Sequence, residues 1–376
     1  MTPRERILAA MNFEIPDRVP LMCQMSIGHM LQQLPNISPV EFWFDVKTFA
    51  EGLIQLRELY NFDGILISLH GHFKNWREIY NQIEKRDNKE IVYLQDRKLI
   101  FTSEDLPLPE FYSPREFPSS ELDLINIPEE IDYIPVSSGL HFNIDLSNKF
   151  EVVELIYKKV GEEFSIHGEI TSPFDYFLDL LGYENALISL IENPEKCKLI
   201  LQKFTNGLAK LTREMCDQPI DAIKISSPFA GAGFISPRFY QEFVLPFESQ
   251  IIQAIKEKNK FVYLHTCGAI NDRLELMIES GTSGLECLDP RPLGDVDLHE
   301  AKKRLGKKVF IKGNIDSVNT LLHGDENRII SNVKEIIEVG KPGGGFILST
   351  ACSIAPFVPQ KNVRILFELV NEYGKY

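Results

Sequence analysis

Short apolar segments rich in β-branched residues recur along the chain, and residues typical of turns bound each of them. Between them, apolar residues recur at helical spacing, as in residues 326–338. Thr2-Pro3, Ser172-Pro173 and Ser236-Pro237 predict helix N-termini, each with a capping side chain followed by proline in the first turn. The predicted strands are Val19–Gln24, Gly64–Leu69, Phe164–Glu169, Ala222–Ser226, Phe261–His265, Gly284–Leu288, Val309–Lys312 and Phe346–Ser349.

Eight strands that alternate with helices are the number needed for a (β/α)8 TIM barrel, an α/β fold. A doubly wound open sheet usually has fewer strands and a phosphate-binding loop after the first of them. The glycines 343–345 come before a strand, so they predict a tight helix-to-strand turn at the N-terminal face of the barrel. The barrel is therefore the expected fold.

One stretch, from Asn81 to about Phe150, breaks the alternation between the second and third strands. It begins with a predicted hairpin, Ile91–Leu94 paired with Lys98–Phe101. Prolines follow at positions 107, 109, 114, 118, 128 and 135, and a proline-rich segment cannot join a central sheet. We expect one barrel domain over residues 1–376, with an insertion at about 81–150 that lies over the barrel.

Composition narrows the class of protein. At about 150 residues per domain, 376 residues suggest two or three domains, but a single α/β barrel can also be this long. The net charge of −14 argues against binding to nucleic acid or to an anionic membrane. No apolar run approaches the roughly 18 residues of a membrane span, and six cysteines are too few for a disulfide scaffold. We expect a cytoplasmic protein.

Candidate metal ligands stand at the ends of two predicted strands. His265 and Cys267 are two residues apart, so they project to the same side if the strand continues to Cys267. Cys352 follows the eighth strand, and both positions belong to the face of a barrel that carries active sites. One imidazole and two thiolates suit Zn²⁺ with one open position. The alternative is that the three are unrelated core or loop residues.

The other four cysteines, Cys23, Cys197, Cys216 and Cys287, are interpreted as small buried apolar residues.

Several strings together resemble the uroporphyrinogen decarboxylase superfamily, and within it the branch of zinc-dependent, corrinoid-linked methyltransferases. The branch assignment rests mainly on His265-Thr-Cys267-Gly268 followed by Cys352. The resemblance covers most of the chain outside the insertion. The strings are residues 2–11, Pro16–Pro20, Ile235–Pro246, His265–Gly268, Gly313–Asp316 and Thr350–Cys352 with Pro356 and Pro359.

Two departures distinguish the chain from the decarboxylases that it resembles. Those enzymes carry Arg-Gln-Ala-Gly-Arg after the first strand to hold substrate carboxylates, whereas this chain has Met25-Ser-Ile-Gly-His29. They also carry a catalytic aspartate at the end of the second strand, where this chain has His70. Without the paired arginines, a substrate with many carboxylates lacks its usual partners, so we do not expect uroporphyrinogen decarboxylation.

The resemblance implies transfer of a methyl group between a corrinoid (cobalamin), carried by a partner protein that docks over the barrel mouth, and a thiol or a methylated small molecule. Zinc lowers the pKa of a bound thiol or acts as a Lewis acid on a methyl donor. By position, Asp289 corresponds to a carboxylate ligand in the similar zinc barrel of cobalamin-independent methionine synthases, and is the candidate fourth ligand. It is equally well explained as a cap for the turn before Pro290.

Further polar residues at strand ends are expected to face the mouth. His70 and His72 share a face by alternation, and Glu169 ends the third strand. His70 and Glu169 are candidate catalytic acids, and each could equally be a hydrogen-bonded rim residue. His72, Asn314 and Asp316 are candidate substrate-binding residues.

Three other functions remain open at this point. One is a zinc alkyl or thiol transferase that uses no corrinoid, such as an enzyme that opens an epoxide with coenzyme M. Another is a metal-free decarboxylase of the uroporphyrinogen decarboxylase type that acts on a smaller substrate. The last is an inert barrel that serves as a binding module, against which the presence of His265, Cys267 and Cys352 argues.

Overall fold

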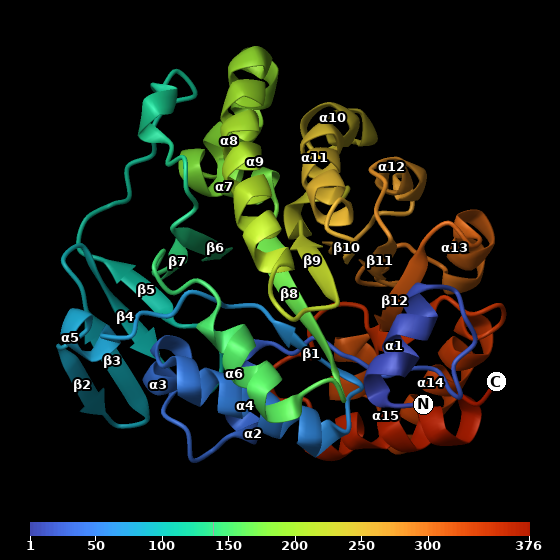
Figure 1. The fold of residues 1–376 in the computed structure, drawn as a ribbon. Helices are drawn as coiled ribbons and strands as arrows, with labels where there is room; N and C mark the ends of the chain where they lie inside the picture. Colours follow the sequence, from blue (N-terminus) through green and yellow to red (C-terminus); the bar gives the residue numbers. More distant parts are fainter. Residues whose placement is uncertain (138) are drawn as a thin grey trace.

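The computed structural model describes residues 1–137 and 139–376. Seven parallel strands form a curled sheet in the order β1-β8-β9-β10-β11-β12-β13, surrounded by helices (Figure 1). This arrangement confirms the TIM-barrel-like α/β fold. The strands are β1 (Gly64–Ile67), β8 (Ser165–Thr171), β9 (Ala222–Ser226), β10 (Phe261–Thr266), β11 (Gly284–Cys287), β12 (Phe310–Ile315) and β13 (Phe346–Thr350).

The segment predicted as the first strand closes the barrel without forming a regular strand. Leu21 and Met25 make isolated parallel bridges to Leu348 and Ile354. On its other side, the Leu21 carbonyl accepts a hydrogen bond from the amide of Asp63 at 2.8 Å. Residues 19–25 therefore take the place of the eighth strand, between β13 and β1.

A cluster of buried charges fixes this closing segment. The Asp63 carboxylate accepts hydrogen bonds from Arg6 at 2.6 Å, from Arg18 at 2.9 and 3.1 Å, and from the amide of Leu21 at 2.7 Å. Asp63 is 1 % exposed, and Arg6 and Arg18 are buried as well. Asp63, just before β1, thus ties the N-terminal helix and the closing segment together.

The helices on the outside of the barrel begin where capping residues predict. Thr2 forms a capping box with Glu5, and Ser172 and Ser236 each accept a hydrogen bond from the first turn of the helix that they precede. The helices are α1 (Pro3–Met11), α2 (Ile27–Gln33), α3 (Pro39–Phe44), α4 (Val46–Tyr60), α5 (Trp76–Ile79), α6 (Glu151–Val160), α7 (Pro173–Leu181), α8 (Tyr183–Glu192), α9 (Pro194–Cys216), α10 (Pro237–Phe243), α11 (Leu245–Lys256), α12 (Leu274–Glu279), α13 (Leu298–Leu305), α14 (Glu326–Gly340) and α15 (Gln360–Tyr373), with short η1 (Leu124–Asn126), η2 (Pro228–Ala230) and η3 (Ser317–Leu322). Within the described residues, none of these helices is both long and apolar enough to cross a membrane.

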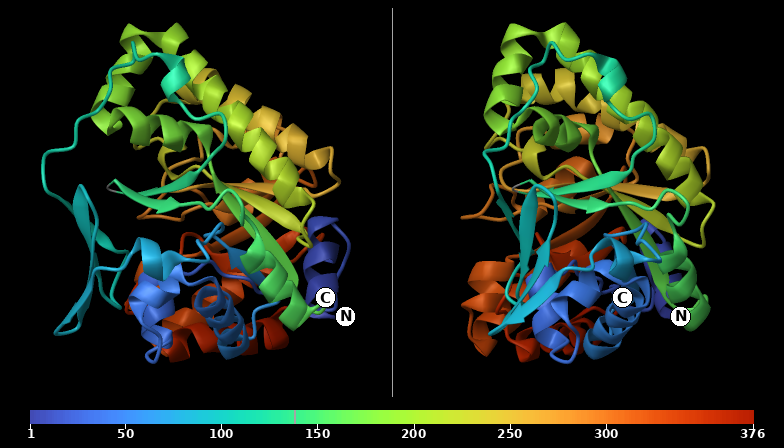
Figure 2. Two further views of the ribbon diagram at one scale, coloured as in Figure 1. Left: turned by 60° about the vertical axis from the view of Figure 1, so that its left-hand side comes forward. Right: turned by 90° about the vertical axis from the view of Figure 1, so that its left-hand side faces the viewer.

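Between β1 and β8, the chain builds a small antiparallel sheet at one side of the barrel and a separate hairpin (Figure 2). The sheet is β2 (Ile83–Arg86), β3 (Lys89–Tyr93), β4 (Arg97–Phe101) and β5 (Leu108–Phe111), and the hairpin is β6 (Tyr133–Ser137) with β7 (Leu140–Asn143). Pro109 lies in β5, which is an edge strand, because proline has no N–H to donate to a neighbour on both sides.

Helix α1 closes the N-terminal end of the barrel. It packs on an apolar layer of inward-facing side chains, and the glycines 343–345 turn the chain into β13 on the same side, all three at positive φ. The layer consists of Met22, Ala222, Tyr263, Phe310 and Ile347. The opposite end, where the parallel strands have their C-termini, is left for the site.

Candidate metal centre

A layer of polar side chains crosses the barrel directly above the apolar layer. Side chains two residues apart on a strand share a face, so the residues two positions after the apolar layer also point inward. They are Gln24, Lys224, His265, Lys312 and Ser349. Two glutamates on neighbouring strands belong to the same layer: Glu169 lies opposite Lys224, and Glu286 lies opposite His265.

The charges in this layer are buried and paired. Lys224, which is fully buried, lies 3.1 Å from Glu169 and 3.4 Å from Glu286, and Lys312 pairs with the other oxygen of Glu286. Burial alone lowers the pKa of Lys224, but Glu169 and then Glu286 outweigh it, so its pKa is raised. Burial raises the pKa of Glu286, yet Lys312 and Lys224 bring it well below its usual range. Two ammonium groups and two carboxylates therefore balance each other.

His265, Cys267 and Cys352 converge above this layer. His265 belongs to β10, Cys267 follows its end, and Cys352 follows the end of β13. Nε2 of His265 lies 3.2 Å from Sγ of Cys267, and the two sulfur atoms are 3.6 Å apart. All three ligand atoms lie within 4.8 Å of one another. The structure thus brings together the three residues predicted from strand ends.

Glu286 orients the imidazole. Its Oε2 lies 2.8 Å from Nδ1 of His265. Nδ1 therefore carries the proton, and Nε2 keeps its lone pair toward the two sulfurs. A carboxylate on the outer nitrogen is the usual support for a metal-binding histidine.

Asp289 borders the same cluster. Its Oδ2 accepts hydrogen bonds from the amide of Gly268 at 2.7 Å and from the thiol of Cys287 at 3.1 Å, while its buried Oδ1 has no partner. Cys267, Cys287 and Asp289 form a second group whose ligand atoms lie within 4.8 Å of one another. Asp289 is grouped with Cys267 but not with His265 and Cys352, and its bond to Gly268 joins the loop after β11 to the loop after β10.

The donor set matches zinc. Two sulfurs bound tetrahedrally at about 2.3 Å lie about 3.8 Å apart, close to the spacing of Cys267 and Cys352. The neighbouring side chains of Cys287 and then Cys352 lower the pKa of the Cys267 thiol, against the opposing effect of burial. Cys267 is therefore predisposed to be a thiolate, which is the form that binds metal.

The cluster opens into a cavity of about 300 Å³ at the mouth of the barrel. Glu169 lines this cavity, and its Oε2 is buried without a hydrogen-bond partner. The insertion contributes Asp105, Leu106 and residues 134–136 to the wall, so it covers part of the mouth. Glu169 thus lines the same cavity as His265, Cys267 and Cys352.

The structure does not bring His70 and His72 to this cavity, so the expectation that their rings face the mouth is not met. Strand β1 ends at Ile67, and the alternation that placed both rings toward the mouth ends with it. His70 packs beside Phe150 at 5.8 Å between ring centroids, and His72 lies 5.2 Å from Phe49 and 4.9 Å from Phe142. Both are at most 2 % exposed, and none of their ring nitrogens has a hydrogen-bond partner.

These two histidines make stability sensitive to acid. Burial lowers the pKa of His70 to about 4 and that of His72 to about 3. An unfolded histidine has a pKa of about 6.5, so below that pH the unfolded chain binds a proton that the folded one does not. Each ring therefore leaves the free energy of unfolding unchanged above pH 6.5 and lowers it as the pH falls toward 3, by about 1.4 kcal/mol per pH unit.

We expect His72→Phe to remove this dependence at one position. The free energies of unfolding of the variant and of the wild type are measured in urea at pH 7, 6 and 5. As the pH falls below 6.5, the value for the variant minus that for the wild type should increase by up to about 1.4 kcal/mol per pH unit. Phe142→Leu is the matched control, because it loosens the same packing but keeps His72, so its difference from the wild type should change much less with pH. A constant difference for His72→Phe would contradict the assignment.

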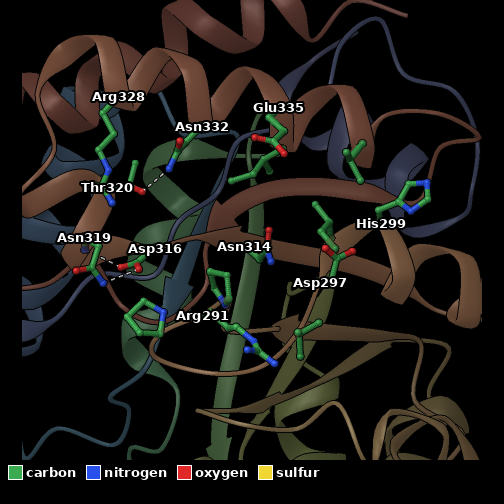
Figure 3. A pocket seen from close by; sticks show the side chains of 16 residues that line it. Arg291, Asp297, His299, Asn314, Asp316, Asn319, Thr320, Arg328, Asn332 and Glu335 are labelled. Carbon is green, nitrogen blue, oxygen red and sulfur yellow. Dashed lines mark hydrogen bonds between the residues drawn. The ribbon is translucent and has the colours of Figure 1, made fainter.

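Asn314 and Asp316 line a different cavity, of about 360 Å³, between the chain after β11, η3 and α14 (Figure 3). The Asn314 amide donates to the carbonyl of Leu288 at 3.0 Å. Asp316 caps η3 by accepting from the amides of Val318 and Asn319. Both residues thus have structural partners outside the mouth cavity, contrary to the expectation that they face its substrate.

Glu286, Lys224, Lys312 and Cys287 are the residues of the site that sequence reasoning missed. The first three are single charged residues within otherwise apolar strands, and that pattern is the signal that would have found them. Cys287 is buried, as expected, and its sulfur also lies within 4.8 Å of ligand atoms of Cys267 and Asp289. No property of the sequence distinguishes it from Cys23.

Comparison with known proteins identifies the family of the chain and finds relatives among both methyltransferases and decarboxylases. The uroporphyrinogen decarboxylase (URO-D) family model matches residues 111–373. A methylcobamide:CoM methyltransferase, MtaA of Methanosarcina barkeri, is 27 % identical over 65 % of this chain and 69 % of its own length. A uroporphyrinogen decarboxylase of Gloeobacter violaceus is 26 % identical over 58 % of this chain and 62 % of its own.

The solved structure of a methyltransferase from Methanosarcina mazei has a TM-score of 0.75 at 22 % identity and covers 99 % of both chains, which shows the shared fold. The matched segment of the family model includes every strand of the barrel from β8 onward and all three residues of the metal cluster. The chain therefore belongs to the uroporphyrinogen decarboxylase family.

Proposed function

We propose that this protein is a zinc-dependent methyltransferase that moves a methyl group between a corrinoid on a partner protein and a thiol or a methylated small molecule. The observation that carries the proposal is the convergence of His265, Cys267 and Cys352 at the barrel mouth, with donor spacings that suit zinc. The methylcobamide:CoM methyltransferases among the relatives support the corrinoid as the second reactant.

In this proposal His265, Cys267 and Cys352 hold the zinc, and Asp289 is the fourth ligand when no substrate is bound. Bound zinc would supply Lewis-acid chemistry at the sulfur, oxygen or nitrogen of the small molecule. Glu286 keeps Nε2 of His265 directed at the sulfurs, and Lys224 and Lys312 hold Glu286 in place. Glu169, with one unpaired oxygen on the cavity wall, orients the substrate.

We assign no role in the reaction to His70, His72, Asn314 or Asp316, because each has its contacts elsewhere. The corrinoid protein is proposed to dock over the mouth, where the cavity opens. We further propose that residues 1–376 act as one barrel domain in the cytoplasm, as the few, unpaired cysteines suggest.

The test uses the absorbance of cobalt. Zinc-loaded protein mixed with cob(I)alamin and a methyl donor is expected to produce the spectrum of methylcob(III)alamin, or, in the reverse direction, to demethylate methylcob(III)alamin when a thiol is added. A protein that contains zinc but causes neither change with any donor or thiol contradicts the corrinoid reaction and favours a corrinoid-free zinc alkyl or thiol transferase.

A further inference from the structure

We propose that the mouth cavity selects a methyl donor without negative charge, and that Leu106 of the insertion helps to set this selection. This inference rests on the proposed function and narrows it, because a thiol or donor bearing a sulfonate or carboxylate is then a poor substrate. It follows from the charges that line the cavity and from those that lie beneath it.

The described residues of the cavity wall include no lysine and no arginine. The wall is largely apolar, and its charged or titratable members are Asp105, Glu169, His265, Cys267 and Cys352. The apolar part consists of Met25, Ile27, Trp43, Leu69, Leu106, Ile134, Pro135, Val136, Ile170 and Pro228. An anion in this cavity meets carboxylates and thiols where proteins that bind sulfonates or carboxylates usually present a guanidinium or ammonium group.

The cation beneath the cavity is already neutralised. Lys224 is fully buried, pairs with Glu169 and Glu286, and donates to the side-chain oxygen of Gln24 at 2.5 Å. Lys312 pairs with Glu286. The four charges cancel, and a zinc ion held by two thiolates adds none, so no net positive field reaches the cavity from below.

Removing a charged group from water costs several kcal/mol unless paired charges and hydrogen bonds in the site offset that cost. This cavity offers an anion no such partners. An uncharged or cationic donor is accepted more readily, since its alkyl part lies on the apolar wall while Oε2 of Glu169, buried and unpaired, accepts a hydrogen bond or attracts the cation. The indole of Trp43 offers a further surface to a cation.

For a methyl ether as donor, the reaction balances with the corrinoid of the proposed function. Cobalt(I) attacks the methyl carbon, so the Co–C bond forms as the C–O bond breaks. The oxygen leaves with the bonding electron pair and takes one proton from solvent to become an alcohol. Cobalt is formally oxidised from +1 to +3, and the two electrons balance the cleavage of the C–O bond.

The test compares three donors of similar size: 2-methoxyethanol, which is neutral, 2-methoxyethylammonium, which is cationic, and methoxyacetate, which is anionic. Dissociation constants are measured on zinc-loaded protein by ligand-observed NMR, and methyl transfer to cob(I)alamin is followed separately. We expect methoxyacetate to bind at least about tenfold more weakly than the other two. Equal or tighter binding of methoxyacetate overturns the inference.

The two measurements separate this inference from the proposed function. The charge ranking comes from binding alone, so it decides the inference even if no methylcob(III)alamin forms with any donor, a result that would count only against the proposed function. Conversely, methyl transfer that is fastest from methoxyacetate supports the proposed function and overturns the charge selection.

Leu106→Arg tests the insertion directly, with Leu108→Arg as the matched control. Leu106 lines the cavity, whereas Leu108, two residues along, is 56 % exposed and lies outside the cavity wall. Leu106→Arg should improve binding of methoxyacetate by about tenfold relative to 2-methoxyethanol, and Leu108→Arg should leave the ranking unchanged. If circular dichroism shows that Leu106→Arg is unfolded, Val136→Arg places the same charge on the same cavity from β6. The same ranking in folded cavity variants as in the wild type overturns the role of the insertion.

Discussion

Cys352→Ala is expected to lower the affinity for zinc by more than about 100-fold. Replacing a residue that only hydrogen-bonds to a metal ligand already lowers metal affinity by about 10- to 100-fold, and Cys352 is proposed as a ligand itself. Cys352 supplies one of the two sulfurs of the cluster, 3.6 Å from Cys267. Methyl transfer to or from the corrinoid should fall with the metal content. The measurement is zinc per chain after dialysis against a weak chelator, by plasma mass spectrometry, alongside the cobalt absorbance assay.

Cys216→Ala is the matched control for this variant. Cys216 is also a buried thiol, but it lies at the end of α9, away from the barrel mouth. It should keep the zinc content and the activity of the wild type. Equal zinc in Cys352→Ala and Cys216→Ala, or no zinc in the wild-type protein, would contradict the metal centre.

Asp63→Ala is expected to lower the free energy of unfolding by about 3–5 kcal/mol, the usual cost of removing one partner from a buried charge pair. The substitution leaves the guanidinium groups of Arg6 and Arg18 buried without the carboxylate that both contact. It also removes the acceptor of the Leu21 amide in the segment that closes the barrel. Urea unfolding followed by circular dichroism gives the change.

Asp17→Ala provides the comparison, because Asp17 pairs with the same arginine from the solvent side. Its Oδ1 lies 2.6 Å from Nε of Arg6, but its side chain is 45 % exposed. Exposed ion pairs contribute about 1 kcal/mol or less, so this variant should lose much less stability than Asp63→Ala. Similar losses in the two variants would show that burial is not what makes the Asp63 cluster important.

The fold was largely predictable because each barrel strand is a short apolar run between turn residues. Seven of the eight predicted segments became strands of the sheet, with ends shifted by a few residues. The exception, Val19–Gln24, makes only isolated bridges. Pro20 has no N–H, so the ladder to β13 is interrupted at its start, although the Pro20 carbonyl still accepts from Leu348 at 2.8 Å.

The convergence of His265, Cys267 and Cys352 was predictable for a related reason. His265 lies within β10, and Cys267 and Cys352 directly follow strands, so strand direction and alternation fix where they point. Beyond a strand end this rule no longer applies. His70 stands three residues after β1, and Asp316 turns back to cap η3, so the faces of both depended on loop geometry that the sequence pattern does not encode.

The charged layer beneath His265, Cys267 and Cys352 was not predicted, because its members are recognised only from the alignment of neighbouring strands. Lys224, Glu286 and Lys312 come from three strands, and each looks like an isolated exception to an apolar pattern. Only the pairings of Glu286 with His265 and with Lys312 on adjacent strands reveal one network. Alignment of the strands places these residues within contact of one another, so that Glu286 pairs with both lysines.

The closure of the barrel by residues 19–25 has a consequence for how the chain folds. Leu21 pairs with Leu348, and the amide of Val19 donates to the carbonyl of Gly374, so segments far apart in the sequence close the barrel together. Contacts between distant segments slow folding, because the chain must close a large loop before they stabilise it. The edge of residues 19–25 that faces β13 stays unpaired until β13 is present. A chain truncated before β13 therefore leaves two strand edges exposed, and such edges promote aggregation.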